Sequence, residues 1–455
     1  MRLSKAVVVV LVVLACCSVG RGATSSLSSQ ESRLHVGWAA VDITPERPVA
    51  LVGQLHKRIS ERVRDPLTAT ALAIETRSAD GPCEQAILVS CDVLFIKKSM
   101  QDRVKEALKT SLPDFDADKL LLNATHTHTG PGFADEDFGT LYDVTNDAGV
   151  MKASEYGDFF VRRIAQVAVE AWQNRKPAGM SWALGHAVVG TNRRTRYFDG
   201  SAVMYGQTNR PDFAGIEGYE DHGVEMLFFW DESDKLTGTV VNLACTAQET
   251  EQLTEVSADF WHDVRAEFHR RIAEGVHVFA QCSPAGDCSP HRLYRTKAEE
   301  TMIRRRDLSN RQEIARRIVN AVEDVMPVAR KDIRTGLVFR HAVARVNLPA
   351  ADSSLSPFYC TDTVSPVEFH VLRLGDVALA TNPFELYLDY GVRIEARSPA
   401  LLTMLVQLSC QNCGYLPTKK AVEGGGYSAD KYAVGPDGGQ VLVDETVRQI
   451  QALWE

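Results

Sequence analysis

Runs of apolar residues bounded by turn-forming residues recur along the chain and predict buried strands. Five such runs cover residues 86–93, 120–124, 224–230, 238–244 and 276–280. Segments with apolar residues at helical spacing lie between or after them and predict helices over residues 98–112, 155–174, 259–272 and 307–325. Strands that alternate with helices are typical of an α/β protein whose largely parallel or mixed sheet is covered on both faces.

Beyond Ile333 the pattern becomes richer in strands and loops, with one further helix predicted near residues 385–397. The expected fold is therefore an α/β fold with a layered mixed sheet flanked by helices and a more irregular C-terminal portion rich in strands and loops. No Gly/Ser-rich or Pro-rich linker, internal repeat or low-complexity tract divides the chain. We expect one large domain, or two that pack closely together, over residues 23–455.

The first 22 residues predict a signal peptide. Two basic residues precede an unbroken apolar run over residues 6–17, and small residues follow up to Gly22. A run of this length is too short to cross a bilayer, which takes about 20 apolar residues. We therefore expect a secreted or periplasmic protein without an integral membrane span. A lipoprotein anchored through Cys16 or Cys17 is the alternative form of export.

The formal net charge is −9, and removal of the first 22 residues with their three cationic side chains makes it more negative. An acidic protein of this kind is not expected to bind nucleic acid or anionic membranes. Eight of the ten cysteines lie beyond Gly22, an even number that is compatible with disulfides in an exported protein. Cys410 and Cys413 form a single C-x-x-C pair, which favours a bridge or free thiols over a zinc or redox site.

Two unusual polar sequences follow predicted strands, at the points where open α/β sheets bind their ligands. The first contains His126 and His128 and continues into Gly-Pro-Gly. In an extended segment, residues two apart point the same way, so both imidazoles can face one point as two metal ligands, or as one ligand and one acid/base group. The alternative is a loop in which both histidines only bond to the backbone.

The second polar sequence follows residues 276–280 and contains Gly286-Asp-Cys-Ser289-Pro. A tight glycine turn after a strand can present a hydroxyl together with free backbone N–H groups, as an acyl nucleophile and its oxyanion site require. An ordinary Asx or Ser turn is the alternative. The chain lacks the G-x-S-x-G, H-E-x-x-H and P-loop motifs, which argues against the common α/β-hydrolases, zincins and P-loop proteins.

Three further groups of residues are candidates for the same site. Arg193, next to Arg194, could bind a carbonyl or carboxylate, although adjacent arginines in a polar loop are usually solvated. Glu385 follows an apolar run and could instead stabilise a helix N-terminus. Tyr415 and Tyr427 lie in glycine-rich loops, where tyrosines more often fill space than take part in chemistry.

Taken together, these sequences resemble the catalytic domain of the neutral/alkaline (non-lysosomal) ceramidase family. The resemblance runs from about residue 35 to the end and follows the family's order. It rests on Val41-Asp-Ile-Thr-Pro45, Asp65-Pro-Leu67, Thr125-His-Thr-His-Thr-Gly-Pro-Gly132, Asn192-Arg193, Ser257-Ala-Asp-Phe260, Gly286-Asp-Cys-Ser-Pro290 and Gly414-Tyr-Leu-Pro-Thr418 followed by Tyr427. We expect no counterpart of the family's additional C-terminal β-sandwich domain.

The resemblance implies a role for each candidate residue. His126, Glu385 and Tyr415 would be zinc ligands, and His128 would be an acid/base or substrate-orienting group. Ser289 would be the essential serine, as nucleophile or as the group that positions a zinc-bound water. Arg193 would support the site electrostatically, and Tyr427 would stabilise the tetrahedral oxyanion.

One family position departs from this pattern. A histidine that would be the remaining zinc ligand is replaced by Thr246. Gln248, His262 or His56 could substitute for it, although the neutral oxygen of glutamine is a poor zinc ligand. The site would then hold zinc with fewer protein ligands, hold a harder divalent metal, or hold none.

The expected function is an exported, metal-assisted hydrolase that cleaves an N-acyl (amide) bond in an acylated small-molecule or lipid substrate. A hydrolase that cleaves an ester, or another acylated substrate such as a sugar, is the first alternative, because a shared fold does not fix the substrate. The second alternative is a non-catalytic exported binding protein with the same cleft.

Overall fold

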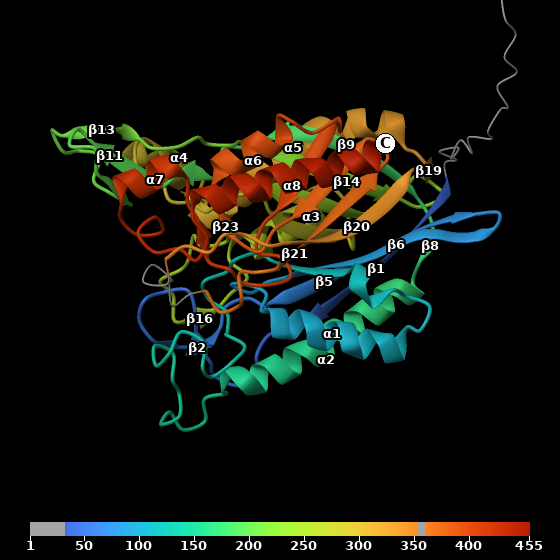
Figure 1. Cartoon of the computed structure of the whole chain (residues 1–455), viewed down its shortest axis with the longest axis horizontal. Helices are drawn as coiled ribbons and strands as arrows, with labels where there is room; N and C mark the ends of the chain where they lie inside the picture. Colours follow the sequence, from blue (N-terminus) through green and yellow to red (C-terminus); the bar gives the residue numbers. More distant parts are fainter. Residues whose placement is uncertain (1–31, 353–359) are drawn as a thin grey trace, which may run out of the picture. The chain divides into compact units, whose positions relative to one another are not determined.

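Three β-sheets form the centre of the molecule (Figure 1). The computed structural model describes residues 32–352 and 360–455, which all belong to one unit. The predicted signal peptide and its two cysteines lie outside the described residues. The first sheet has the order β19 (Gly336–Leu337), β1 (Ser32–Asp42), β5 (Thr68–Ser78), β6 (Gly81–Cys91) and β7 (Leu120–Ala124), with β8 (Lys176–Pro177) beside β1.

The second and third sheets have four strands each. The second has the order β17 (His277–Cys282), β15 (Leu236–Leu243), β14 (Gly223–Trp230) and β9 (Gly179–His186), and the third β20 (Phe339–Val346), β21 (Val367–Leu374), β22 (Val377–Thr381) and β24 (Leu402–Val406). Within each sheet one pair is parallel, namely β6 with β7, β15 with β17, and β22 with β24, and the other long pairs are antiparallel. The mixed α/β architecture expected from the sequence is thus confirmed.

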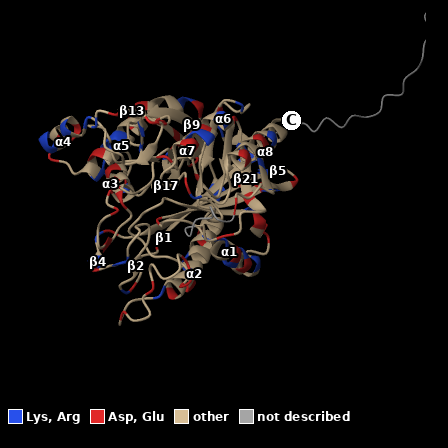
Figure 2. Ribbon diagram, turned by 60° about the vertical axis from the view of Figure 1, so that its left-hand side comes forward, with Lys and Arg blue, Asp and Glu red and all other residues tan. Residues whose placement is uncertain are grey.

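Helices cover the outer faces of the sheets. The first sheet is covered by α1 (Lys98–Ser111) and α2 (Ala153–Gln173), the second by α3 (Phe260–Arg271) and α5 (Asn310–Ala329), and the third by α8 (Pro436–Trp454), which packs on α6 (Leu388–Glu395). The inner faces share a core in which apolar residues of β1, β5 and β6 meet residues of β14, β17 and β22. Figure 2 shows acidic and basic residues interspersed along the outer helices, for example on α1.

All five predicted strands and all five predicted helices are confirmed, with ends that move by a few residues. The C-terminal portion also contains α8, a helix that the sequence pattern did not predict. Over residues 32–352 and 360–455, no helix is long and apolar enough to cross a membrane. The eight cysteines beyond Gly22 are free thiols in the structure.

The carboxyl ends of three strands, one from each sheet, meet at one place. Strand β7 ends at Ala124, whose N–H donates to the carbonyl of Leu408, just after β24. The carbonyl of Cys282, at the end of β17, accepts a hydrogen bond from the backbone N–H of Gln407. The side chain of Asn123 also crosses between sheets and donates to the carbonyl of Ala280 at 3.2 Å. The loops that leave these strands therefore lie next to one another.

Candidate functional site

The two histidines after β7 lie side by side. Their ring centres are 4.9 Å apart, and the rings are inclined at 75°. The geometry is not the extended one assumed from the sequence, because His126 has a φ of 66°. Its backbone N–H donates to the carbonyl of Val93, and its ring Nδ1 lies 2.7 Å from the carbonyl oxygen of Leu94. A carbonyl only accepts hydrogen bonds, so Nδ1 carries the donated hydrogen and Nε2 of the neutral imidazole carries a lone pair.

Five of the seven candidate residues line one pocket of about 490 Å³, a volume that includes its open mouth. These five are His126, His128, Glu385, Tyr415 and Tyr427. The remaining wall is mostly apolar and consists of Gly53, Leu55, Leu94, Phe95, Phe138, Tyr142, Leu408 and Asn412. A concave, mostly apolar pocket with a few convergent polar groups is typical of a small-molecule site.

Glu385 and Tyr415 are brought together by a short parallel pair of strands. Strand β23 (Glu385–Leu386) pairs with β25 (Tyr415–Leu416), and Glu385 lies directly opposite Tyr415. The ring of Tyr427 contacts that of Tyr415 edge to face, with centres 5.7 Å apart. Burial, followed by the nearby Glu385 carboxylate, raises the pKa of Tyr427 to about 12. Tyr427 therefore keeps its proton at neutral pH and can donate it in a hydrogen bond.

Arg193 lies behind these residues and is almost fully buried, in contrast to the solvated alternative. Its Nη2 donates to the hydroxyl of Tyr415 at 3.2 Å and to the carbonyl of Gly286 at 3.0 Å, and its Nη1 donates to the hydroxyl of Tyr205 at 3.1 Å. Although burial opposes it, the surrounding Tyr205, Tyr415 and Glu385 hold the pKa of Arg193 well above its ordinary value. A fixed positive charge therefore stands beside Tyr415.

Arg194 is also fully buried and organises the loop that carries Tyr427. It is paired with Glu217 at 2.6 Å, and it donates to the carbonyls of Tyr427 and Gly425 at 3.1 and 2.8 Å. The adjacent arginines thus have separate functions, one beside the pocket and one in the supporting loop.

His126 and Glu385 have the geometry of two metal ligands. The Nε2 of His126 lies 3.4 Å from Oε2 of Glu385, and this carboxylate oxygen is buried without a hydrogen-bond donor among the described residues. Two acceptors that face each other in a buried place are satisfied by a cation between them. The bond from Nδ1 to the Leu94 carbonyl is the usual support of a metal-ligating histidine. These residues therefore fit a divalent cation.

Few side chains at this place can bind a metal ion. Among residues 32–352 and 360–455, no three His, Cys, Asp or Glu side chains come together closely enough to hold a metal ion. A third protein ligand would therefore have to be of another type, and the candidate is Tyr415, which pairs with Glu385 in the backbone and lines the same pocket. Its hydroxyl oxygen accepts a hydrogen bond from Arg193, which stabilises negative charge on that oxygen.

The residues considered as substitutes for the absent histidine are engaged elsewhere. The hydroxyl of Thr246 donates to Oε1 of Gln248 at 2.5 Å, and that oxygen also accepts a hydrogen bond from Arg193 at 3.3 Å. The amide nitrogen of Gln248 donates to Tyr205 and to Glu251, so the whole side chain is used. His262 lines a different pocket at the start of α3, and the exposed His56 is not part of the lining.

Ser289 is fully buried and does not line the pocket. It lies in β18 (Cys288–Ser289), which pairs with β10 (Thr191–Asn192), and its hydroxyl accepts a hydrogen bond from the backbone N–H of His291 at 3.3 Å. The turn before it approaches the site, since the carbonyl of Gly286 accepts a hydrogen bond from Arg193. Of the seven candidates, Ser289 and Arg193 do not line the pocket, and Arg193 reaches it through its hydrogen bond to Tyr415.

Several residues near His128 were missed by the sequence analysis. Oε2 of Glu251 lies 3.3 Å from Nδ1 of His128, and Oε1 of Glu251 lies 3.3 Å from Nε2 of His291. Burial is the main reason that the pKa of His128 is well below its ordinary value, and the neighbouring cationic groups lower it further. The His128 imidazole is therefore neutral at neutral pH. No motif surrounds Glu251 in the sequence, so only its place in space reveals it.

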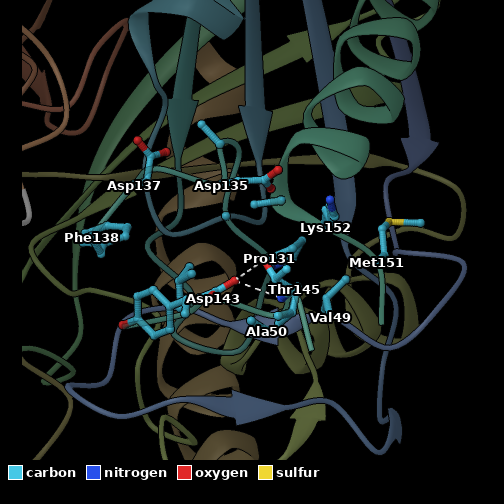
Figure 3. Close-up of a pocket in the computed structure, with 16 residues that line it drawn as sticks. Val49, Ala50, Pro131, Asp135, Asp137, Phe138, Asp143, Thr145, Met151 and Lys152 are labelled. Atoms are coloured by element: carbon cyan, nitrogen blue, oxygen red, sulfur yellow. Dashed lines mark hydrogen bonds between the residues drawn. The ribbon is translucent and has the colours of Figure 1, made fainter. Parts of the chain in front are cut away.

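A second pocket of about 520 Å³, including its mouth, adjoins the first (Figure 3). Phe138 and Tyr142 belong to the walls of both pockets. The Tyr142 hydroxyl donates to the carbonyl of Gln54 and accepts a hydrogen bond from the backbone N–H of Gly53 at 3.1 Å. This common wall thus fixes the loop at Gly53 that borders the first pocket.

Comparison with solved structures finds the same fold in ceramidases. The neutral ceramidase from Pseudomonas aeruginosa superimposes with a TM-score of 0.70 over 93% of this chain and 75% of its own, at 16% sequence identity. A ceramidase complexed with C2 gives a TM-score of 0.68 over the same shares, at 17% identity. No protein-family model matches the sequence, and no curated protein matches it. At this level of identity, the chain shares the fold of these ceramidases.

Proposed function

We propose that this protein is a metal-assisted hydrolase that cleaves the N-acyl (amide) bond of an acylated substrate, as a ceramidase does. The observation that carries the proposal is the buried pair of facing acceptors, His126 Nε2 and Glu385 Oε2, 3.4 Å apart beside His128. The fold shared with the ceramidase structures supports it, since 93% of this chain superimposes on 75% of each of theirs.

His126, Glu385 and Tyr415 would hold the cation. A bound divalent cation polarises a carbonyl oxygen and lowers the pKa of a bound water. The other chemistry belongs to the chain itself. Neutral His128 accepts the proton of the attacking group and later gives it to the departing amine. Tyr427 keeps its proton and donates a hydrogen bond to the oxyanion.

Ser289 enters the proposal as a residue that supports the site rather than as the attacking group. Its hydroxyl is buried outside the pocket lining. This hydroxyl accepts a hydrogen bond from the N–H of His291, and the turn just before Ser289 carries the Gly286 carbonyl that accepts from Arg193. The attacking group in the proposed reaction is therefore water.

The apolar part of the wall indicates the kind of substrate. Leu55, Leu94, Phe95 and Leu408 surround the polar groups, so the pocket favours an apolar acyl or amine chain next to the scissile bond. Leu55 is 60% exposed, which places apolar surface at the edge of the site.

The test uses the full purified protein with N-acyl amides of long-chain amines, matched esters and an acylated sugar. We expect amide hydrolysis that a chelator abolishes and that zinc, manganese or calcium restores in part. His126→Ala should lower kcat/KM by about 100-fold or more and release the metal. His262→Ala, outside the pocket, is the matched control and should leave kcat/KM and the metal content unchanged.

Two results would count against the proposal. Cleavage of esters without cleavage of amides would refute the assignment of the bond. Absence of turnover with every metal and every substrate, together with tight binding of an acylated compound, would identify a binding protein instead.

A further inference from the structure

We propose that Glu251 is a positioning residue for His128, which it holds in the tautomer with the proton on Nδ1 so that Nε2 faces the pocket as the base. The inference rests on the proposed hydrolase function. Its first support is the contact of 3.3 Å between Glu251 Oε2 and His128 Nδ1. A ring proton on Nδ1 would lie beside this carboxylate and leave Nε2 as the acceptor.

The backbones of the two residues are fixed to each other through a third. Nη2 of buried Arg58 donates to the carbonyl of His128 at 2.6 Å, and Nη1 donates to the carbonyl of Glu251, also at 2.6 Å. Nη1 donates further to the carbonyl of Leu253 at 2.7 Å. One planar guanidinium thus joins the loop after β7 to the loop after β15, and the distance between imidazole and carboxylate is set by main-chain bonds.

The Glu251 carboxylate is fixed from its other side as well. Nε2 of Gln248 donates to Oε2 of Glu251 at 3.0 Å, and Gln248 is itself held by Thr246 and Tyr205. Thr246 stands where the sequence led us to expect a metal-ligating histidine. In this chain the position supplies instead the first link of a hydrogen-bond chain that runs through Gln248 to Glu251, whose carboxylate lies 3.3 Å from His128 Nδ1.

A second contact of the His128 ring is with the Gly53 backbone, next to Cγ and Nδ1. A Cβ atom at Gly53 would lie 2.6 Å from Cγ of His128, so the glycine backbone packs directly on the ring. The contact to Glu251 falls outside the angular range of a well-formed hydrogen bond, and neither ring nitrogen of His128 has another partner in the described part of the chain. Such pairs commonly tighten when the substrate binds. A base oriented by a carboxylate that does not touch the substrate is the arrangement of nucleophile-activating dyads and triads.

The first test compares Glu251→Gln with Glu249→Gln. Glu249 lies in the same loop but bonds to Asn310 instead of facing the His128 ring. The amide introduced by Glu251→Gln can donate toward Nδ1 and thereby favour the other tautomer. We expect kcat to fall by roughly 10²–10⁴-fold in Glu251→Gln with KM changed by less than about threefold. Glu251→Asp, which keeps the charge, should lie between the wild type and Glu251→Gln, and Glu249→Gln should stay within about twofold of the wild type.

The second test reads the tautomer without activity. Long-range ¹H–¹⁵N spectra of ¹⁵N-histidine-labelled full-length protein, assigned with His128→Gln, should show His128 protonated on Nδ1, and this signature should disappear in Glu251→Gln. A wild-type protein with His128 protonated on Nε2 would overturn the inference. Equal kcat in Glu251→Gln and Glu249→Gln would also overturn it while leaving the hydrolase function intact. A protein that hydrolyses nothing refutes the proposed function, and the spectrum then still decides the orientation of His128.

Discussion

At the scale of single residues, the pocket depends on a glycine whose conformation and surroundings both exclude a side chain. Gly53 has a φ of 107°, and a Cβ there would collide with the His128 ring at 2.6 Å. Gly81 has a similar φ of 122°, but a Cβ there meets none of the described atoms within 4 Å. An alanine at either position strains the backbone, but only an alanine at position 53 also displaces the His128 ring. Comparing the two variants therefore distinguishes the two effects.

We predict that Gly53→Ala and Gly81→Ala both lower the free energy of unfolding by about 1–3 kcal/mol, because an alanine is strained at these φ values. Only Gly53→Ala should lower kcat, by about 100-fold, since a shift of the catalytic group by about 1 Å has an effect of this size. Urea unfolding and steady-state kinetics check the two parts. Equal kcat in both variants would show that the ring does not need the contact.

Thr246 gives a second prediction at this scale. Its loop lies against the segment before His126, because the N–H of Ala247 donates to the carbonyl of Thr125 at 3.1 Å. Thr246→His would add a second nitrogen ligand to a proposed metal site in which only His126 supplies nitrogen. We expect zinc affinity to rise at least about tenfold, or about 1.4 kcal/mol, in competition with a chromophoric chelator.

Thr246→Val is the control for this substitution, since it removes the same hydroxyl and adds no ligand. Turnover should not rise in Thr246→His, because the histidine displaces Gln248 and with it the support of Glu251. Equal zinc affinity in the two variants would mean that position 246 is too far from His126 and Glu385 to contribute a ligand.

The site residues that the sequence identified share a property that the missed ones lack. His126, Tyr415 and Tyr427 lie in sequences rich in glycine or in a repeated pattern, which stand out from their surroundings. Glu251 and Arg58 lie in loops without such a pattern. Their places beside His128 depend on the hydrogen bonds that Arg58 donates to the main-chain carbonyls of Glu251 and His128. No spacing of residues along the chain encodes these bonds.

At the scale of elements, apolar periodicity located the strands and helices that have uninterrupted apolar faces. Strand β7 was predicted with both of its ends correct, and α1 ends one residue before the predicted end. Strand β5 was missed, because its sequence TATALAIETRS is rich in alanine and shows no clear alternation. Its neighbours β1 and β6 determine its conformation through a long antiparallel register on each side. Tertiary pairing here overrides local preference.

Helix α8 was missed for a different reason. Its first turns contain Gly438 and Gly439, which lower helix propensity by about 1 kcal/mol each relative to alanine. The structure explains both residues by close packing. A Cβ at Gly439 would lie 2.4 Å from the ring of Tyr390 on α6, and one at Gly438 would lie 2.3 Å from Val434. Gly439 thus lets α8 approach α6, and Gly438 lets the chain before α8 pack on its first turn.

Helix α5 carries a buried carboxylate that makes its stability depend on pH. Glu313 is fully buried and accepts hydrogen bonds from Arg316 at 2.8 Å and from Arg317 at 2.9 Å. Burial alone would raise the pKa of Glu313, but the two arginines outweigh it and lower the pKa to about 2. Because the folded-state pKa lies below the unfolded value of 4.5, the stabilisation is present above pH 4.5 and is lost as the pH falls toward 2.

We predict that Glu313→Gln lowers the free energy of unfolding by about 3 kcal/mol at pH 7, and by progressively less between pH 4.5 and pH 3. Glu323→Gln on the same helix is the control. Its side chain is 41% exposed in a surface pair with Arg271, so it should change stability by less than about 1 kcal/mol. Urea titrations at several pH values measure both, and a pH-independent difference for Glu313→Gln would contradict the assignment.

At the scale of the whole molecule, the site exists because three sheets end at the same place. Apolar runs identified strands of the first and second sheets, but they do not encode which sheet each strand joins. The shared inner core decides this, because it buries Trp38 of β1 against Phe229 of β14 and Phe279 of β17. The pocket therefore gathers residues from position 53 to position 427, and loss of packing between the sheets would disrupt it as a unit.

Two carboxyl groups, buried Glu225 on the second sheet and half-buried Glu395 on α6, interact electrostatically. Glu225 lies on β14, and one of its carboxyl oxygens is buried without a hydrogen-bond partner among the described residues. Burial, and then the charges of Glu395 and Asp221, raise the pKa of Glu225 well above its ordinary value. Glu395 ends α6, and burial with the charge of Asp221 raises its pKa to about 8. A carboxyl group with a raised folded-state pKa favours folding most below the unfolded pKa of 4.5 and opposes it increasingly as the pH rises through 8.

We therefore predict that the wild-type Tm falls between pH 5 and pH 9, as Glu395 ionises next to Glu225 and Asp221. Glu395→Gln removes that ionisation and should raise Tm at pH 8.5 by several degrees, with little effect at pH 5. The exposed Glu423 on α7 (Lys419–Gly424) is the control, because Glu423→Gln changes the net charge of the acidic protein equally without touching the pair. Scanning calorimetry at four pH values separates the two causes. If Glu423→Gln stabilises the protein at pH 8.5 as much as Glu395→Gln does, overall charge repulsion and not the buried pair makes the fold sensitive to alkaline pH.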